Sequence, residues 1–321
     1  MGYTLGVMAP PNLPIRTFID YVAHAENHGF DEVWFAEDCF LKGGVSQTAV
    51  ALASTSRLVV GMGILPAGVR NVAFVALDIA FLANLYPGRL MVGIGHGMAD
   101  WMRQVGALPT SPLTLLKEYL QTLRALLAGE TVTFSGRHVQ LNAVRLDEPP
   151  STAPLVFAGV RGPKSLALSG QHADGTILAE PVTPEYLDFA RREIGAGSNH
   201  PIVAYNIAAV DDDGDAARSR VRPALAVVGQ PAWAPHIKPL GFADELTALS
   251  RDSSSAAEFV RGIPDEWVDQ LAVVGSPSQA QERLRDLHLA GADHLVLTPA
   301  GDDPVSALEN LSRVRPPTRR S

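Results

Sequence analysis

The sequence predicts an α/β protein of the (β/α)8 barrel (TIM barrel) class, and three features of the chain lead to this prediction. Short apolar runs rich in Val, Ile and Leu alternate with stretches whose apolar residues recur at helical spacing. The short runs are apolar almost throughout, which is typical of parallel strands covered on both faces. The 321-residue length fits one such barrel with insertions. We therefore expect a single domain over residues 1–321.

Eight strands and seven accompanying helices can be assigned in order along the chain. The expected strands cover residues 4–9, 32–37, 57–65, 89–95, 154–160, 175–179, 201–210 and 293–299. The helices expected beside them run from Pro14 to a stop at Gly29 and over residues 46–56, 72–86, 113–129, 163–172, 183–195 and 276–291. Residues 131–141 alternate around Ser135-Gly136 and predict a hairpin outside the main sheet. Residues 211–270 contain no regular strand–helix unit and are expected to form a helical insertion before the last unit.

Composition excludes several classes of function. The chain has 26 basic and 34 acidic residues and a net charge of −8, which disfavours nucleic acid as a partner. Its single cysteine, Cys39, fits a reducing compartment and is most simply a small apolar filler. No basic leader and no apolar run of membrane-spanning length is present. We expect a cytoplasmic protein that acts on a small molecule.

The active site of a (β/α)8 barrel lies at the carboxyl ends of its strands. The residues there are Met8, Pro10, Glu37, Asp38, Cys39, Gly63, Ile64, Leu65, His96, Met98, Gly159, Val160, Arg161, Glu180, Asn206 and Thr298. This set is poor in charge and rich in glycine and apolar side chains. It favours a flat organic cofactor over a metal centre, so no metal site is predicted.

Three alternating glycines lie at the carboxyl end of the fourth expected strand, at Gly93, Gly95 and Gly97. A dinucleotide-binding turn would need Gly-x-Gly-x-x-Gly, and here the third glycine comes one position early. In a barrel, these glycines would instead let the backbone approach a bound ligand. His96 stands between them, and its ordinary pKa suits proton transfer near neutral pH. The alternative is that His96 packs against Trp101 and bonds a backbone carbonyl.

The segment GVRGPK, residues 159–164, is the best candidate for binding phosphate. Gly159 and Gly162 leave backbone N–H groups accessible, and Pro163 suits the first position of a helix. Arg161 and Lys164 add positive charge. The alternative is an ordinary turn between a strand and a helix with two solvated cations.

Together, these motifs resemble the bacterial luciferase-like flavin and deazaflavin oxidoreductases. The matching segments are residues 26–40, 56–97, 123–141, 153–179 and 291–299, which span most of the chain outside about 211–265. The pair GVRGPK and ADGTILA is most similar to the branch that uses coenzyme F420, including methylenetetrahydromethanopterin-reductase-like proteins.

The resemblance implies that F420 lies across the barrel mouth, with its phosphate arm toward Gly159–Lys164 and a cis peptide bond at Gly63–Ile64. The cofactor-binding residues it implies are Met8, Asp38, Cys39, Gly63, Ile64, Leu65, Gly95, His96, Gly97, Gly159, Val160, Arg161, Gly162, Pro163 and Lys164. The implied substrate contacts are Met98, Trp101 and Glu180. Relatives commonly form homodimers, and the helix expected at 72–86 is apolar nearly all round.

The chain departs from this family at two positions. Many relatives have Asp-His or Glu-His where this chain has Asp38-Cys39, and some place an acid where Met98 stands. An alcohol dehydrogenase must remove a hydroxyl proton, and this chain lacks that histidine and that acid. We therefore expect instead a reductase of a C=C, C=N or imine bond. Asp38, Glu37 and His96 are the catalytic candidates. The alternatives are an FMN-dependent monooxygenase and a non-catalytic ligand-binding barrel.

Overall fold

The computed structural model describes residues 2–197, 199–301 and 303–315. Within the described residues, eight parallel strands (β1, β2, β3, β4, β7, β8, β9 and β11) each precede a helix along the chain. This order confirms the predicted (β/α)8 class. The chain divides into two compact units, described separately below: unit 1 is Met1–Phe30, Leu178–Arg192 and Ile202–Ser321, and unit 2 is Asp31–Ile177 and Glu193–Pro201. No helix among the described residues is both long enough and apolar enough to span a membrane.

Unit 2 is built on a parallel sheet of consecutive strands. These are β2 (Glu32–Phe35), β3 (Val59–Pro66), β4 (Leu90–Gly95), β7 (Val156–Gly159) and most of β8 (Gly175–Leu178). Each strand pairs in parallel with the next in this order. Nearly all of their residues are buried, as near-continuous apolar strands predict.

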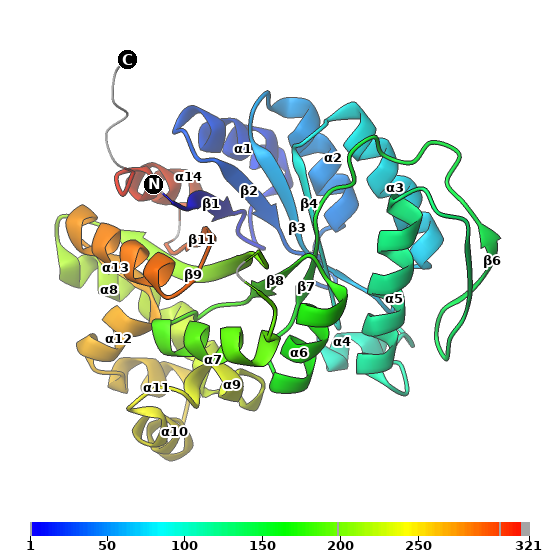
Figure 1. The fold of residues 1–321 in the computed structure, drawn as a ribbon. Coiled ribbons are helices and arrows are strands. Elements are labelled where there is room, and N and C mark those ends of the chain that lie inside the picture. Colours follow the sequence, from blue (N-terminus) through cyan, green and yellow to red (C-terminus); the bar gives the residue numbers. More distant parts are fainter. Residues whose placement is uncertain (1, 198, 302, 316–321) are drawn as a thin grey trace. The chain divides into compact units, whose positions relative to one another are not determined.

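Helices follow the strands of unit 2 in the predicted order. They are α2 (Gly44–Ser54), α3 (Val72–Leu85), α5 (Pro112–Leu127) and α6 (Pro163–His172), together with a short helix that was not predicted, α4 (Ala99–Gln104). The predicted hairpin is confirmed as β5 (Val132–Ser135) and β6 (Gln140–Val144). It lies outside α5, away from the parallel strands (Figure 1).

Unit 1 contains β1 (Thr4–Met8), β9 (Ile202–Val210) and β11 (His294–Pro299), where β11 pairs in parallel with both β1 and β9. A further strand, β10 (Val273–Gly275), pairs in parallel with β9. The sequence did not predict β10, because three residues are too few to show a periodic pattern.

The helices of unit 1 include α1 (Phe18–Asn27), α13 (Pro277–Leu289) and α14 (Pro304–Ser312), while α7 (Pro184–Ile194) extends two residues beyond the unit. The helix predicted from Pro14 begins later, because a 3-10 turn, η1 (Ile15–Thr17), precedes α1.

The predicted insertion is helical. It consists of α8 (Gly214–Val221), η2 (Arg222–Gly229), η3 (Pro231–Trp233), α9 (Ala234–Ile237), α10 (Ala243–Asp252), α11 (Ala256–Gly262) and α12 (Asp265–Leu271). Its apolar side chains form a cluster with Ile207 and Ala209 of β9 and Val274 of β10. Figure 1 shows α10, α11 and α12 grouped together in yellow and orange.

Candidate functional site

The carboxyl ends of four neighbouring strands of unit 2 form an edge that we call the site edge. It carries residues 37–39 after β2, residues 63–65 of β3, residues 96–98 after β4 and residues 160–164 after β7. Because these strands are parallel and adjacent, the four segments lie along one edge of the sheet. Most of the residues predicted from the sequence therefore come together here.

Ile64 packs on the glycines of the site edge. The Gly63–Ile64 peptide bond is cis, as the family resemblance implied. A Cβ atom on Gly95 would lie 2.5 Å from Ile64 Cδ1, one on Gly93 would lie 3.2 Å from Ile64 Cγ2, and one on Gly159 would meet the same side chain. Gly93, Gly95 and Gly159 therefore make room for the Ile64 side chain. Ile64 is itself partly exposed and offers an apolar surface.

Glu37 is held in an ion pair at the end of β2. Both of its carboxylate oxygens accept from the Arg70 guanidinium, with Nη2 of Arg70 2.8 Å from Oε2. The N–H of Gly44, at the start of α2, also donates to Oε2 at 2.6 Å. Gly44 has no room for a side chain, because a Cβ there would lie 2.6 Å from Cδ2 of the buried Leu65. With its oxygens occupied, Glu37 suits a positioning role better than the proton transfer expected from the sequence.

Asp38 carries the available carboxyl group of the site edge. Its backbone carbonyl accepts the N–H of Leu41 at 2.8 Å, while its side chain makes no hydrogen bond or ion pair with any described residue. Burial raises the pKa of this carboxyl. Asp38 therefore keeps its proton to a higher pH than an exposed aspartate, as a proton donor requires.

Cys39 follows Asp38 and is partly buried. Burial and the neighbouring Glu37 and Asp38 carboxylates raise the pKa of its thiol, an effect that Arg70 partly offsets. The group is therefore a neutral thiol at neutral pH, and a nucleophilic role is disfavoured.

His96 links the end of β4 to the start of α6. Its Nε2 lies 3.2 Å from the hydroxyl oxygen of Ser165, in the first turn of α6. Burial lowers the pKa of the imidazole, an effect that a hydrogen bond with the Pro112 backbone partly offsets, so the ring is neutral near pH 7. Ser165 was not predicted from the sequence, although it directly follows the candidate phosphate turn that ends at Lys164.

The predicted phosphate turn forms the N-terminus of α6, a helix of 10 residues. Gly162 is the N-cap and supplies no side-chain cap, and Pro163 is the first helical residue. A Cβ on Gly162 would meet no atom within 4 Å, so the space beside the turn is open. Lys164 is exposed and Arg161 is half-buried. The first-turn N–H groups and these cations favour an anionic group here.

The segment after β4 contains the short helix that the sequence did not predict. β4 ends at Gly95, and Met98 is the N-cap of α4. Gly97 has a φ of 70°, which favours glycine. Trp101, an expected substrate contact, lies in α4 and is half-buried.

Two predicted site residues, Met8 and Glu180, lie in unit 1. The backbone carbonyl of Met8 accepts the Tyr21 hydroxyl at 2.9 Å. Glu180 precedes a cis proline, and its carbonyl accepts the indole N–H of Trp233 at 2.8 Å. The insertion therefore anchors the segment after β8 through Trp233.

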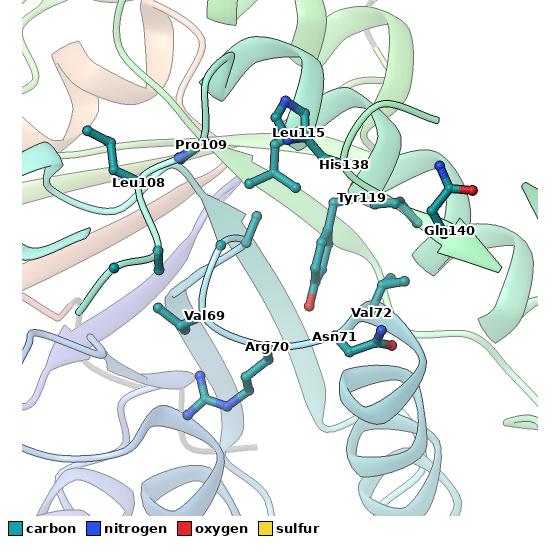
Figure 2. Close-up of a pocket in the computed structure, with 15 residues that line it drawn as sticks. Val69, Arg70, Asn71, Val72, Leu108, Pro109, Leu115, Tyr119, His138 and Gln140 are labelled. Atoms are coloured by element: carbon teal, nitrogen blue, oxygen red, sulfur yellow. The ribbon is translucent and has the colours of Figure 1, made fainter. Parts of the chain in front are cut away.

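A cavity of about 420 Å³ opens beside the loop between β3 and α3; we call it the side cavity. Residues 67–72, residues 106–109, Leu115 and Tyr119 of α5 and residues 138–140 of the hairpin line it. Figure 2 shows the Tyr119 hydroxyl directed toward the loop that carries Arg70 and Asn71. The sequence did not predict this cavity. One of its walls is the hairpin, which is held in place by a contact between residues about 20 positions apart in the chain.

That contact is made by Glu118, a carboxylate only 7% exposed. It accepts the backbone N–H groups of Arg137, His138 and Val139 at 2.7, 2.8 and 2.9 Å. Burial alone would raise the pKa of Glu118, but these N–H groups favour the carboxylate and lower it. The resulting stabilisation is present above the unfolded-state pKa and is lost as the pH falls through the folded-state pKa.

Glu118→Ala is expected to lower the free energy of unfolding by about 2–4 kcal/mol, because three backbone N–H groups lose a buried, charged acceptor. Urea unfolding followed by circular dichroism measures the change. Glu118→Gln keeps the shape and one acceptor oxygen, so it should cost less than Glu118→Ala. A Glu118→Ala protein within about 0.5 kcal/mol of the wild type would contradict this account of the hairpin.

Among the described residues, no group of three His, Cys, Asp or Glu side chains is placed to hold a metal ion.

The chain matches the family model described as luciferase-like monooxygenase over residues 3–294. The 5,10-methylenetetrahydromethanopterin reductase of Methanolobus tindarius is 26% identical over 325 residues, covering 97% of this chain and 98% of the relative. The F420-dependent glucose-6-phosphate dehydrogenase of Segniliparus rotundus is 27% identical, covering 95% of this chain and 94% of the relative.

A solved structure shows the same fold. It is the coenzyme F420-dependent tetrahydromethanopterin reductase from Methanopyrus kandleri, with a TM-score of 0.84 and 20% identity over 97% of each chain.

Proposed function

Because this chain belongs to the luciferase-like monooxygenase family, we propose that it is an F420-dependent oxidoreductase that reduces an unsaturated small organic molecule. The names of two full-length relatives support this proposal, one a methylenetetrahydromethanopterin reductase and the other an F420-dependent dehydrogenase. The observation that carries it is the site edge itself: an apolar surface at Ile64, an open helix N-terminus at Gly162 and, at Asp38, a carboxyl whose pKa is raised by burial.

The residues present fit a deazaflavin with a phosphate arm. The partly exposed Ile64 would lie against the flat ring, and His96 would hydrogen-bond a polar edge of the ring or substrate. The open space and first-turn N–H groups at Gly162 would hold the phosphate.

Reduced F420 supplies a hydride, so the protein must supply the matching proton. Asp38 is partly buried, burial raises the pKa of its carboxyl, and its side chain has no competing partner among the described residues. Asp38 would donate its proton to one atom of the C=C, C=N or imine bond, while the bound cofactor would supply the hydride to the other. Glu37 is less suited than Asp38 to donate this proton, because Arg70 and the N–H of Gly44 already donate hydrogen bonds to its carboxylate oxygens.

The proposal is tested by mixing the protein with reduced F420 and a panel of unsaturated acceptors under anaerobic conditions. Acceptor-dependent return of the oxidised deazaflavin absorbance is the expected result. Turnover that is lost in the Asp38→Asn protein would also exclude a non-catalytic ligand-binding barrel. An inert protein with every acceptor would contradict the proposal.

The second candidate is an FMN-dependent monooxygenase, which the description of the family itself favours. A reduced flavin would occupy the same edge, with its phosphate at the same helix N-terminus. Oxygen-dependent consumption of reduced FMN with incorporation of oxygen into a substrate would establish this alternative.

We also propose a homodimer formed through α3. The outer face of this helix exposes Phe74 and Phe81 at 69% and 65%, with Leu77 and Leu85 between and after them. These positions fall on one stripe of the helix, while Val75, Ala76 and Ile79 face the core. A contiguous apolar stripe of this kind favours burial against another protein surface.

Light scattering at micromolar concentration should give the mass of two chains. Changing Phe74 and Phe81 to Glu should give a single-chain mass, because the charges would have to be buried in the interface. Leu289→Glu is the matched control, since Leu289 is equally apolar and exposed but lies on α13 of unit 1. A wild-type mass of one chain would contradict the proposal.

A further inference from the structure

Arg70 connects the side cavity with the loop after β2 that carries Asp38, the proposed proton donor, and Cys39. It lies between β3 and α3, and Figure 2 shows its side chain extending from this loop away from Tyr119. There it forms the two-point ion pair with Glu37, whose side chain is 9% exposed against 33% for Arg70. A two-point pair of this kind compensates the negative charge of the carboxylate and fixes the orientation of both side chains.

Glu37 is the residue through which the loop of Asp38 and Cys39 is held. Its carboxylate binds Arg70 and the N–H of Gly44, and its own N–H donates to the carbonyl of Ile64 at 3.4 Å. Asp38 and Cys39 follow directly in the chain. Without Arg70, Glu37 would keep an uncompensated, nearly buried negative charge beside Asp38.

We propose that Arg70 is a positioning residue of this site, which acts through Glu37 to hold the loop of Asp38 and Cys39 and to balance its negative charge. The inference extends the proposed function, because that loop carries the proposed proton donor. It also makes a claim that does not depend on any cofactor: the charge of Arg70 acts on the groups of the loop.

Cys39 provides the probe, because it is the single cysteine of the chain and is partly accessible. The charged groups that act on its thiol are Glu37, Asp38 and Arg70, and among them Arg70 alone favours the thiolate. The rate of alkylation by iodoacetamide, measured against pH, gives the thiol pKa of the whole protein without any ligand.

In the Arg70→Met protein, the inflection of this profile should move up by about half a pH unit or more, because a compensating positive charge is lost. Glu37→Gln should move it down. Combining both changes should bring it back toward the wild-type position. Arg70→Lys retains the charge and should restore most of the wild-type profile, although it lacks the planar fork.

Arg124→Met is the matched control. Arg124 lies on α5 and pairs with Asp174, and 43% of the Arg124 side chain is exposed. Loss of its charge should therefore leave the Cys39 profile unchanged. Circular dichroism establishes that each variant is folded. An Arg70→Met profile identical to that of Arg124→Met, or one displaced downward, would overturn the proposal. Because the assay contains no cofactor, this outcome is separate from a failure of F420-dependent turnover.

Discussion

Asp38→Asn is expected to lower kcat for reduction by about 10²-fold or more, which is the usual contribution of a positioned general acid. Asparagine has the shape of aspartic acid but cannot release a proton to the substrate. The affinity for the cofactor should change much less than kcat. Single-turnover rates with pre-reduced F420 measure the effect apart from product release.

The pH dependence gives a second measure of the same group. Burial raises the pKa of Asp38, so its protonated form persists to a higher pH, and the rate of reduction should fall as the pH rises through that pKa. Asp38→Asn should remove this limb of the profile. His96→Gln is the comparison: it keeps a hydrogen-bonding side chain near Ser165, so a loss of about tenfold or less is expected. Asp38→Asn with wild-type kcat and an unchanged profile would refute the proton-donor role.

Gly162→Val should weaken F420 binding by about tenfold to a hundredfold, because its side chain would fill the space where the phosphate approaches the N–H groups of α6. The fold should tolerate the change, since a Cβ on Gly162 meets no atom within 4 Å and its φ of −95° suits valine. Lys164→Ala removes only an exposed charge, so a loss of a few-fold is expected. Equilibrium titration of each variant with oxidised F420 measures these affinities.

The control for this comparison is Gly241→Val. Gly241 lies in the insertion of unit 1, and a Cβ there also meets no atom within 4 Å, so the same substitution should leave F420 affinity unchanged. Equal tolerance of Gly162→Val and Lys164→Ala would contradict the assignment of the phosphate to the backbone of α6.

Much of the fold could be predicted because parallel barrel strands are apolar throughout and their helices are amphipathic. The predicted strand at 89–95 is β4 within one residue, and the cis bond at Gly63–Ile64 followed from family resemblance. The strand β10 and the helix α4 escaped prediction, because three and six residues are too short for a period to show.

The site was harder to predict, because its decisive contacts join distant parts of the chain. Nothing local to Glu37 shows that Arg70, 33 positions away, would occupy its carboxylate. Ser165 and the hairpin wall of the side cavity depend on contacts of the same kind, over 69 and about 20 positions. The sequence singled out Gly93 and Gly95, but only the three-dimensional register shows that both face the Ile64 side chain.

The central claim, that this site edge holds a deazaflavin, is tested most directly by titrating the wild-type protein separately with F420 and with FMN. Quenching of the cofactor fluorescence gives each dissociation constant. We expect saturable micromolar binding of F420 and weaker binding of FMN. Micromolar binding of FMN with no detectable binding of F420 would contradict the claim and leave the flavin-dependent monooxygenase in its place.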